Sequence, residues 1–318
     1  MNKSEPLLIR LAKVLSLLLI ALSVSFFYET ASRYFKIFNI IYLTDTQAIP
    51  LESLSKLDVL DPHLLAKGRE EMSKHRVTIA GITRDNAADS PVMMRHIEHI
   101  GGLFADYLVI LFENDSRDGT QAILHDWETK NNKVHIISKN YNNQKRAGLQ
   151  FLADARNHYL ETIKSDPKYK DFDILMVVDM DMKYGIDIRG IEDSFAQIDR
   201  WDGVRSNGIS DEAGHMFDMF AFRELVAPLK PEVEADQYLW GKVPVPGKRK
   251  VYEANSGLLE VDSCFGGMAF YKMKAIEGCL YDGGDCEHVA FHECMRTRNG
   301  ARLFMNPAQM LRYSHFRE

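Results

Sequence analysis

The sequence contains few cysteines and no excess of positive charge. Its formal net charge is −6, and because binding to nucleic acid needs clustered Lys and Arg, we expect no nucleic-acid partner. The cysteines form no CxxC pair and lack the spacing to histidines that is typical of a zinc site. In an oxidising compartment they could form one or two disulfides, and in a reducing one they would be small buried apolar side chains. The spacing alone does not decide between disulfides and free thiols for Cys264, Cys279, Cys286 and Cys294.

Internal repeats and low-complexity tracts are also absent, and 46% of the 318 residues are hydrophobic. We therefore expect one large α/β domain with a tail. In the tail, an uncharged apolar run from Val14 to Tyr28 follows Lys3, Arg10 and Lys13. A membrane span needs about 20 residues, so this run must extend over Leu11 and Ala12 or keep Lys13 at the interface.

Basic residues ahead of an apolar run favour a cytoplasmic N-terminus, so this segment predicts a single-pass type II membrane protein. A cleaved signal peptide and a buried core helix are the alternatives. Residues 1–43 are expected to form the signal anchor and its flanks, residues 44–75 a stem, and residues 76–318 the catalytic domain.

From Arg76 onward, short β-branched runs alternate with helical stretches, a pattern that indicates βαβ units and a largely parallel sheet. The expected helices cover residues 89–100, 119–130, 148–164 and 188–199. The expected strands are Val77–Ile82, Tyr107–Phe112, Lys133–Ser138, Ile174–Val178 and Gly203–Arg205. In such sheets ligands bind beyond the carboxyl ends of the strands, so the residues that follow each strand are the first candidates for a site.

Polar residues follow three of these strands, at 83–86, 113–116 and 179–181. In "FENDSRDGT", Glu113 and Asp115 could accept hydrogen bonds from the base or ribose of a nucleotide. The alternative needs no ligand: Asp118 or Ser116 would cap the next helix, with Gly119 in the turn.

Asp179 and Asp181, in "LMVVDMDM", would face the same side of a continuing strand. Two such carboxylates make part of an oxygen cage for Mn²⁺ or Mg²⁺, completed by diphosphate oxygens and water. The ion would neutralise charge that develops on a leaving diphosphate. Asp-x-Asp alone is a weak motif, but the apolar strand before it favours a metal site over a merely polar strand end.

The order of "FENDSRDGT", "LADARNHYL" and "ILMVVDMDM" resembles GT-A glycosyltransferases, and in particular the fungal capsule-associated α-1,3-mannosyltransferase-like family and the Anp1/Mnn9-type mannosyltransferases. The resemblance covers residue 76 to about residue 315 and is one of pattern. It implies a Rossmann-like mixed, mostly parallel sheet and transfer of a sugar, first mannose, from a nucleotide-diphospho-sugar. The donor would be GDP-mannose or, second, a UDP-sugar, and the acceptor a glycan or lipid-linked molecule. In a eukaryotic host the domain would face a Golgi-type lumen.

The resemblance also implies roles for single residues. Asp179 and Asp181 match the motif that holds the metal and the donor diphosphate, and His315 matches a C-terminal histidine that completes the metal shell. Glu113 and Asp115 match the acidic strand end near the nucleoside. Arg156 and Asn157 match an Arg-Asn pair of the donor site, where Arg156 would contact diphosphate or sugar. Otherwise Arg156 would be an exposed helical arginine and His315 an exposed terminal residue.

Three later segments complete the predicted site. Asp218, in "GHMFDMFAFR", matches a residue that contacts sugar hydroxyls, although it could instead pair with Arg223. Gly266 and Gly267 would let a backbone approach the donor or acceptor sugar, or would simply form a turn.

Asp285 and Glu287 stand at the head of a predicted helix, where an inverting enzyme keeps its catalytic base. Acids at a helix start are also favoured by the helix dipole, and a retaining enzyme needs no such base. His288 and His292 have the spacing of a metalloprotease motif, but Val289 stands where that motif requires glutamate, so a protease is excluded.

Two other functions are compatible with this pattern. A catalytically silent GT-A-like protein would bind a sugar nucleotide without turnover, although the acids and Arg156 are all present. A nucleotidyltransferase would also use metal-binding acids, but it usually has a glycine-rich loop after its first strand, and "GITRDNAADS" lacks one.

Overall fold

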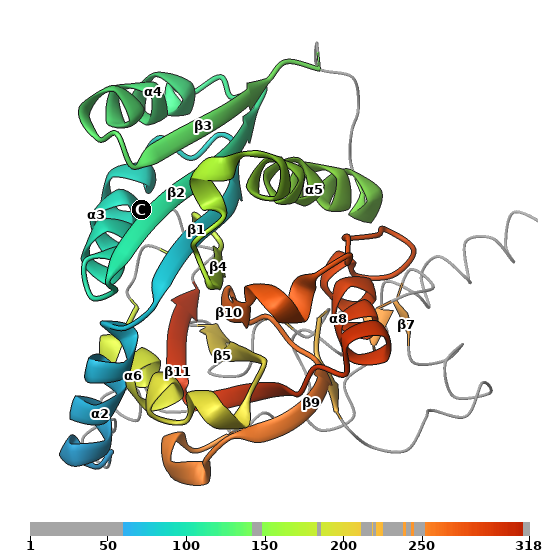
Figure 1. The fold of residues 1–318 in the computed structure, drawn as a ribbon. Helices are drawn as coiled ribbons and strands as arrows, with labels where there is room; N and C mark the ends of the chain where they lie inside the picture. Colours follow the sequence, from blue (N-terminus) through green and yellow to red (C-terminus); the bar gives the residue numbers. More distant parts are fainter. Residues whose placement is uncertain are drawn as a thin grey trace, which may run out of the picture. The chain divides into compact units, whose positions relative to one another are not determined.

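The computed structural model describes residues 60–141, 148–182, 186–210, 218, 221–224, 238–239, 243–244 and 252–313. Their centre is a nine-stranded sheet with the order β3-β2-β1-β4-β10-β5-β11-β9-β6 (Figure 1). Within these ranges no helix is long and apolar enough to cross a membrane. The predicted anchor at residues 14–28 lies outside them.

The first half of the sheet is built from four parallel strands. They are β1 (Arg76–Thr83), β2 (Asp106–Asn114), β3 (Val134–Lys139) and β4 (Ile174–Val178). Helices α3 (Ser90–Gly101), α4 (Thr120–Lys130) and α5 (Leu149–Ser165) connect them. The βαβ pattern predicted from the sequence is therefore confirmed in this half, and β4 has the predicted bounds.

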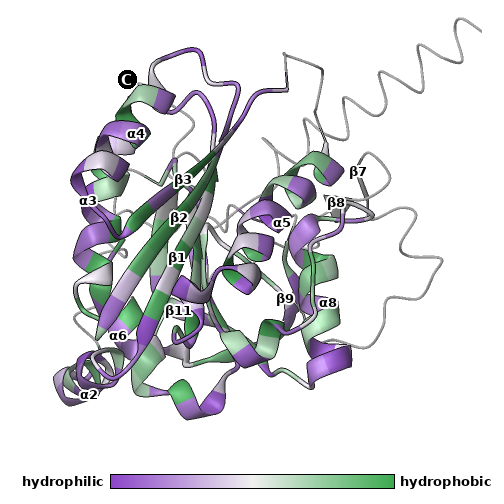
Figure 2. Cartoon of the chain, turned by 45° about the horizontal axis from the view of Figure 1, so that its top comes forward, coloured by the Kyte–Doolittle hydropathy of each residue, from purple (hydrophilic) through white to green (hydrophobic). Residues whose placement is uncertain are grey.

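Helices cover both faces of this half-sheet, which is why its strands are apolar along most of their length. Ile174, Met176 and Val178 of β4 belong to the same core as residues of α3 and α4. Leu175 and Val177 belong to the core formed with α5 and α8 (Glu287–Asn299), and the two helix pairs lie on opposite sides of the sheet (Figure 2). Strand alternation thus directs position 179 toward α5 and α8.

The second half of the sheet is mixed. β10 (Met268–Lys272) lies antiparallel between β4 and β5 (Gly203–Ser210), and β5 pairs in parallel with β11 (Leu303–Tyr313). β9 (Leu259–Ser263) and the short β6 (Arg223–Glu224) complete the sheet. A separate pair is formed by β7 (Tyr238–Leu239) and β8 (Val243–Pro244). β5 is longer than predicted because β11 pairs along it.

One helix of the structure was not predicted. α2 (Pro62–Met72) lies in the segment expected to be a stem, and it packs against α6 (Ile188–Ala196). The Asp61 side chain caps it and proline occupies its first turn, where a missing N–H costs nothing. Gly68 allows the contact, because a Cβ there would lie 1.8 Å from the carbonyl oxygen of Glu192. The folded unit therefore includes at least residues 61–72 of the predicted stem.

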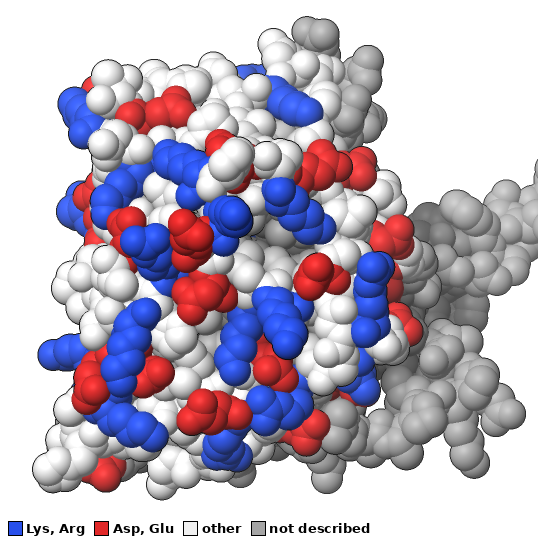
Figure 3. Space-filling model, in the orientation of Figure 1, with Lys and Arg blue, Asp and Glu red and all other residues white. Residues whose placement is uncertain are grey.

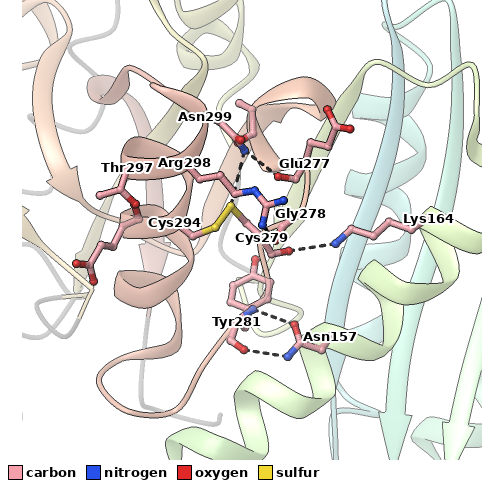
Figure 4. Close-up of a disulfide and its surroundings, with 12 residues drawn as sticks. Asn157, Lys164, Glu277, Gly278, Cys279, Tyr281, Cys294, Thr297, Arg298 and Asn299 are labelled. Atoms are coloured by element: carbon pink, nitrogen blue, oxygen red, sulfur yellow. Dashed lines mark hydrogen bonds between the residues drawn. A yellow bond between two sulfur atoms is a disulfide. The ribbon is translucent and has the colours of Figure 1, made fainter.

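A disulfide between Cys279 and Cys294 ties α8 to the loop that precedes it (Figure 4). The other two cysteines, Cys264 and Cys286, are buried free thiols. Asn157 of α5 binds the same loop twice: its Nδ2 donates to the carbonyl oxygen of Tyr281, and its Oδ1 accepts from the Tyr281 N–H, both at 2.9 Å. The loop is thus held to both helices that border the cavity described next.

The surface seen in Figure 3 carries Lys and Arg side chains interspersed with Asp and Glu. Interspersed charges of both signs are typical of a solvated surface.

Candidate functional site

A cavity of about 470 Å³ opens at the carboxyl ends of β1 and β4. It is lined by polar residues that follow the two strands and by residues of α5 and α8. The residues that matter for its chemistry are Thr83, Arg84, Arg156, Asp179, Asp181, Asp218, Glu287 and His288. The cavity therefore lies where the sequence predicted it, beyond the carboxyl ends of the strands. α8, which is distant from these strands in sequence, forms another part of its wall.

Arg156 lies in this cavity between two carboxylates. Its Nε donates to Oε1 of Glu287 at 3.1 Å, and its Nη2 donates to Oδ1 of Asp179 at 3.3 Å. The residue is only 4% exposed, and its guanidinium lies over the ring of Phe265. Its Nη1 is buried and has no hydrogen-bond partner among the described residues. The protein thus binds the Nε and Nη2 groups of this planar cation and leaves Nη1 as a donor for a ligand.

Asp179 and Asp181 follow β4 directly, and both line the cavity. The Asp179 N–H donates to the carbonyl oxygen of Gly267 at 2.9 Å, which fixes its backbone. Burial, together with the negative charges of Asp181 and Asp218, outweighs the effect of Arg156 and raises the pKa of Asp179 to about 8. Negative charge is therefore crowded at this end of the sheet.

These carboxylates fit a divalent cation that binds substrate phosphates. In the part of the chain that the structure describes, no three His, Cys, Asp or Glu side chains are grouped to hold a metal by themselves. Mg²⁺ and similar hard cations commonly use one or two carboxylates and take their other ligands from phosphates and water. Asp179 and Asp181 match this donor set, whereas His315 lies outside the described residues.

Gly266 and Gly267 form a turn next to Phe265, which lines the cavity, but neither glycine lines it. Their φ angles are 65° and 87°, a region that favours glycine, and a Cβ at Gly266 would lie 2.1 Å from the carbonyl oxygen of Ser206. The Gly266 N–H donates to Oδ2 of Asp218 at 3.0 Å, and the Asp218 Oδ1 accepts from the Ala221 N–H at 3.3 Å. Asp218 therefore both buttresses this turn and lines the cavity, where burial raises its pKa.

The two acids before and at the start of α8 are placed differently. Asp285 binds Arg223, whose Nη2 lies 3.1 and 3.2 Å from its two carboxylate oxygens, and Asp285 does not line the cavity. Glu287 lines the cavity and is 4% exposed, with its Oε2 accepting from the Cys286 thiol at 3.7 Å. Glu287 is therefore the acid of this pair that a ligand in the cavity can reach, whereas Asp285 pairs with Arg223.

The acids that follow β2 lie outside the cavity lining. Glu113 is 1% exposed, and its Oε1 accepts from the Ser116 N–H at 3.0 Å. Asp115 has a φ of 50° and accepts from the Tyr141 N–H at 2.9 Å. Asp118 accepts from the N–H groups of Ala87 and Thr120, so it ties the loop after β2 to the loop after β1 and to the first residue of α4, whose N-cap is Gly119. These residues shape the neighbouring loops, and the structure does not bring Glu113 or Asp115 to the cavity wall.

Asn157 also lies off the cavity, although it follows Arg156 directly. Both the nitrogen and the oxygen of its amide bind the Tyr281 backbone, as described above. Because successive helical residues point about 100° apart, Arg156 and Asn157 cannot both face the same ligand. Asn157 instead positions the loop that leads to Glu287.

His288 was not predicted as a site residue, yet it lines the cavity next to Glu287. It is 2% exposed and stacks on Phe265 with ring centroids 3.9 Å apart. In sequence it was considered only as part of a protease motif that is incomplete. Its position beside Glu287 at the start of a predicted helix was the feature of the sequence that could have identified it as a site residue.

No protein-family model matches this chain, and no curated protein is detectably similar to it. Three solved structures have a similar fold at low identity. A mannosyltransferase from Pyrobaculum calidifontis in complex with GDP-Man and Mn²⁺ is 12% identical over 76% of this chain, with a TM-score of 0.42. S. aureus TarS, residues 1–349, is 11% identical over 75% of this chain with a TM-score of 0.44. GalNAc-T7 with UDP, GalNAc and Mn²⁺ is 13% identical over 77% of this chain with a TM-score of 0.43.

The chain spans 57%, 60% and 45% of the lengths of these three structures. With so few identical residues and such low TM-scores, we derive function from the side chains of the cavity and not from these likenesses.

Proposed function

We propose that this chain is a glycosyltransferase of the GT-A type, which moves a sugar from a nucleotide-diphospho-sugar to an acceptor hydroxyl with the help of a divalent cation. The observation that carries the proposal is the buried Arg156, which joins Asp179 and Glu287 inside a cavity at the carboxyl end of the sheet. A guanidinium can bind a diphosphate, a pair of carboxylates after one strand can bind its divalent cation, and a further acid at a helix start can act as the base of an inverting transfer.

Arg156 would bind the donor diphosphate. Guanidinium groups form charge-assisted hydrogen bonds to phosphate oxygens, and the buried Nη1 has no partner among the described residues. A buried donor without a partner costs about 1–3 kcal/mol, which a phosphate oxygen in the cavity would recover. Arg84 lines the same cavity and adds positive charge beyond the end of β1.

Asp179 and Asp181 would hold the cation, Mn²⁺ or Mg²⁺, together with phosphate oxygens of the donor. The ion, when bound, neutralises charge on the leaving diphosphate. Asp179 is oriented by Arg156 on one side and by the backbone of Gly267 on the other. The same guanidinium would thus position both the diphosphate and a carboxylate that binds its cation.

Glu287 would receive the proton of the attacking hydroxyl if the reaction inverts configuration. Its carboxylate is held by Arg156 and by the Cys286 thiol, and each oxygen keeps a further lone pair for the acceptor. In a retaining reaction Glu287 would only orient Arg156. Asp218, on the Gly266 side of the cavity, would accept hydrogen bonds from sugar hydroxyls.

The finer identity of the substrates rests on the sequence resemblance. It favours mannose as the sugar, GDP-mannose before a UDP-sugar as the donor, and a glycan or lipid-linked acceptor. The apolar run at residues 14–28 would anchor the domain to a membrane, and in a eukaryote the domain would face a Golgi-type lumen.

The test uses the full chain with Mn²⁺ and, in separate reactions, GDP-mannose, UDP-glucose and UDP-GlcNAc. Release of nucleoside diphosphate from one donor is the expected result, and EDTA should abolish it. Asp181→Asn should abolish it as well, while keeping the melting temperature of the ligand-free protein. Asp126→Asn is the matched control, because Asp126 is exposed on α4, away from the cavity, and pairs with the neighbouring Lys130. Full turnover in Asp181→Asn, or in EDTA, would contradict the metal role.

Two other outcomes separate the alternatives. Tight binding of a sugar nucleotide without release of nucleoside diphosphate, with any acceptor, would identify a binding protein that has lost turnover. Release of pyrophosphate from a nucleoside triphosphate and a sugar phosphate would instead identify a nucleotidyltransferase.

A further inference from the structure

We infer that His288 recognises a hydroxyl group of the sugar bound in this cavity, an inference that rests on the proposed function. His288 lies at the second position of α8, lines the cavity and is 2% exposed. Both of its ring nitrogens are buried and have no hydrogen-bond partner among the described residues. Such an imidazole is costly unless a ligand or water binds it.

The unpartnered groups of this cavity lie together. Buried polar atoms without a partner occur at several described positions, and those of Thr83, Arg156 and His288 all line the same cavity. The Arg156 group suits a phosphate oxygen, since it is cationic. Thr83 and His288 offer neutral groups, and neutral donor and acceptor pairs match hydroxyls rather than phosphates.

His288 stays neutral in this setting. Burial and the positive charges of Arg156 and Arg205 lower the pKa of its imidazole well below the usual range. A neutral imidazole has one donor nitrogen and one acceptor nitrogen, so it can donate to one sugar oxygen and accept from a hydroxyl. Glu287 lies 3.6 Å from its Nε2, beyond hydrogen-bond distance.

The ring is also held rigidly. It stacks on Phe265 at 3.9 Å between centroids, and the Tyr281 ring meets it edge-on at 5.5 Å. Phe265 also lies under the Arg156 guanidinium at 5.2 Å. The sugar-recognising imidazole and the proposed phosphate-binding guanidinium therefore share one aromatic support, which sets their spacing.

His288→Phe is the first test, because phenylalanine keeps the stacked ring and removes both nitrogens. In a binding measurement with Mn²⁺, wild type and variant are compared in their affinity for the sugar nucleotide that the wild type binds, GDP-mannose first, and for its nucleoside diphosphate. If the hydroxyl belongs to the donor sugar, the preference for the sugar nucleotide over the nucleoside diphosphate falls by about tenfold, while the nucleoside diphosphate binds as before. If it belongs to the acceptor, donor binding is unchanged and the KM for methyl α-mannoside as acceptor rises by a similar factor.

A structural role for His288 would be revealed by stability. Because no described residue uses its nitrogens, the melting temperature of ligand-free His288→Phe should equal or exceed that of wild type. His292→Phe is the matched control one turn later, since His292 binds Ser263 and Tyr271 at 2.8 and 2.9 Å. We expect that control to lower the melting temperature by roughly 4–8 °C. His288→Gln, whose amide both donates and accepts, should restore most of the lost preference.

Each outcome decides between the two levels of the proposal. A wild-type chain that binds none of GDP-mannose, UDP-glucose and UDP-GlcNAc overturns the proposed function and this inference with it. A wild type that binds one of them, with His288→Phe unchanged in both the donor and acceptor measurements, overturns the role of His288 alone. A melting temperature of His288→Phe as low as that of His292→Phe assigns His288 to packing and also overturns it.

Discussion

Arg156 and Glu287 form a buried ion pair across 131 positions of sequence, with the Nε of Arg156 3.1 Å from Oε1 of Glu287. The pair joins α5, which connects β3 to β4 in the parallel half of the sheet, to α8, which lies between β10 and β11 of the mixed half. A buried ion pair adds little net stability, but removing one partner leaves the other charge buried and unpaired. The pair therefore couples the integrity of the site to that of the fold.

Arg156→Ala should lower the free energy of unfolding by about 3 kcal/mol, because Glu287 and Asp179 both lose a partner. Urea denaturation measures this. Arg95→Ala, an exposed arginine of α3, should stay within about 0.5 kcal/mol of wild type. The double variant Arg156→Ala/Glu287→Ala should cost less than the sum of the two single variants. Additive costs would show that the two side chains are not coupled.

Gly266→Ala should destabilise the chain more than Gly300→Ala. Both glycines have positive φ, 65° and 63°, but a Cβ at Gly266 would strike the Ser206 carbonyl, whereas nothing lies within 4 Å of one at Gly300. Gly300→Ala should therefore lower the free energy of unfolding only by the strain of a left-handed backbone conformation at alanine, about 1–2 kcal/mol. Thermal unfolding of the two variants checks this. Equal losses would mean that the turn beside Asp218 shifts without cost.

The ion pair between His75 and Asp173 should make stability depend on pH. The hydrogen bond with Asp173 raises the pKa of His75. Burial alone would raise the pKa of Asp173, but the hydrogen bonds with His75 and with the Arg76 N–H, together with the charge of His75, lower it. The contribution is complete between about pH 4, above the unfolded pKa of aspartate, and about pH 6.5, the unfolded pKa of histidine. It is lost as the pH rises through the folded pKa of His75, or falls through that of Asp173.

Asp173→Asn tests this pair while keeping an oxygen for the Arg76 N–H, which now donates to Asp173 at 2.9 Å. Because both side chains are partly exposed, we expect a gap of about 0.5–1 kcal/mol from wild type at pH 5.5. The gap should shrink markedly by pH 9. Urea denaturation at both pH values measures it, and a gap that does not change with pH would rule out the ionic contribution.

Reduction of the Cys279–Cys294 disulfide should lower stability by about 3 kcal/mol, the loop-closure value for a separation of 15 residues. Thermal unfolding with and without a phosphine reductant measures this. The variant Cys279→Ser/Cys294→Ser should be less stable than wild type and insensitive to the reductant. Cys264 is fully buried and does not line the cavity, so it should not react with a thiol reagent before unfolding. A wild type that the reductant does not affect would mean that these cysteines are not paired in solution.

Local patterns predicted the parallel half of the sheet because each element carries its own signal there. Ile174–Val178 is a run of five buried apolar residues ahead of two acids, and its bounds followed from sequence alone. The sequence around β10 does not mark the ends of the strand so clearly. Its place between β4 and β5 depends on pairing with residues about 90 positions away, such as Met268 with Val178. Such long-range pairing is not encoded in a local period.

The site divides in the same way. The rule that ligands bind beyond the carboxyl ends of strands correctly predicted that Asp179 and Asp181 line the cavity, because they directly follow a strand of the parallel sheet. The rule could not predict that Glu287 lines the cavity and Asp285 does not. Nor could it predict that Arg156 lines the cavity and Asn157 does not, because both choices depend on how α5 and α8 are rotated against each other. His288 was missed for a similar reason: its value as a site residue comes from Phe265 and Arg156, which are distant in sequence.

β10 lies between β4 and β5, so the two halves of the sheet remain separate until residues 268–272 have left the ribosome. Until then the five buried residues of β4 present an unpaired apolar edge, which is a template for unwanted pairing. Arg156 likewise has no Glu287 to bind until α8 has been made. During synthesis the chain thus passes through a stage in which this edge is exposed, and its cavity is among the last parts of the domain to close.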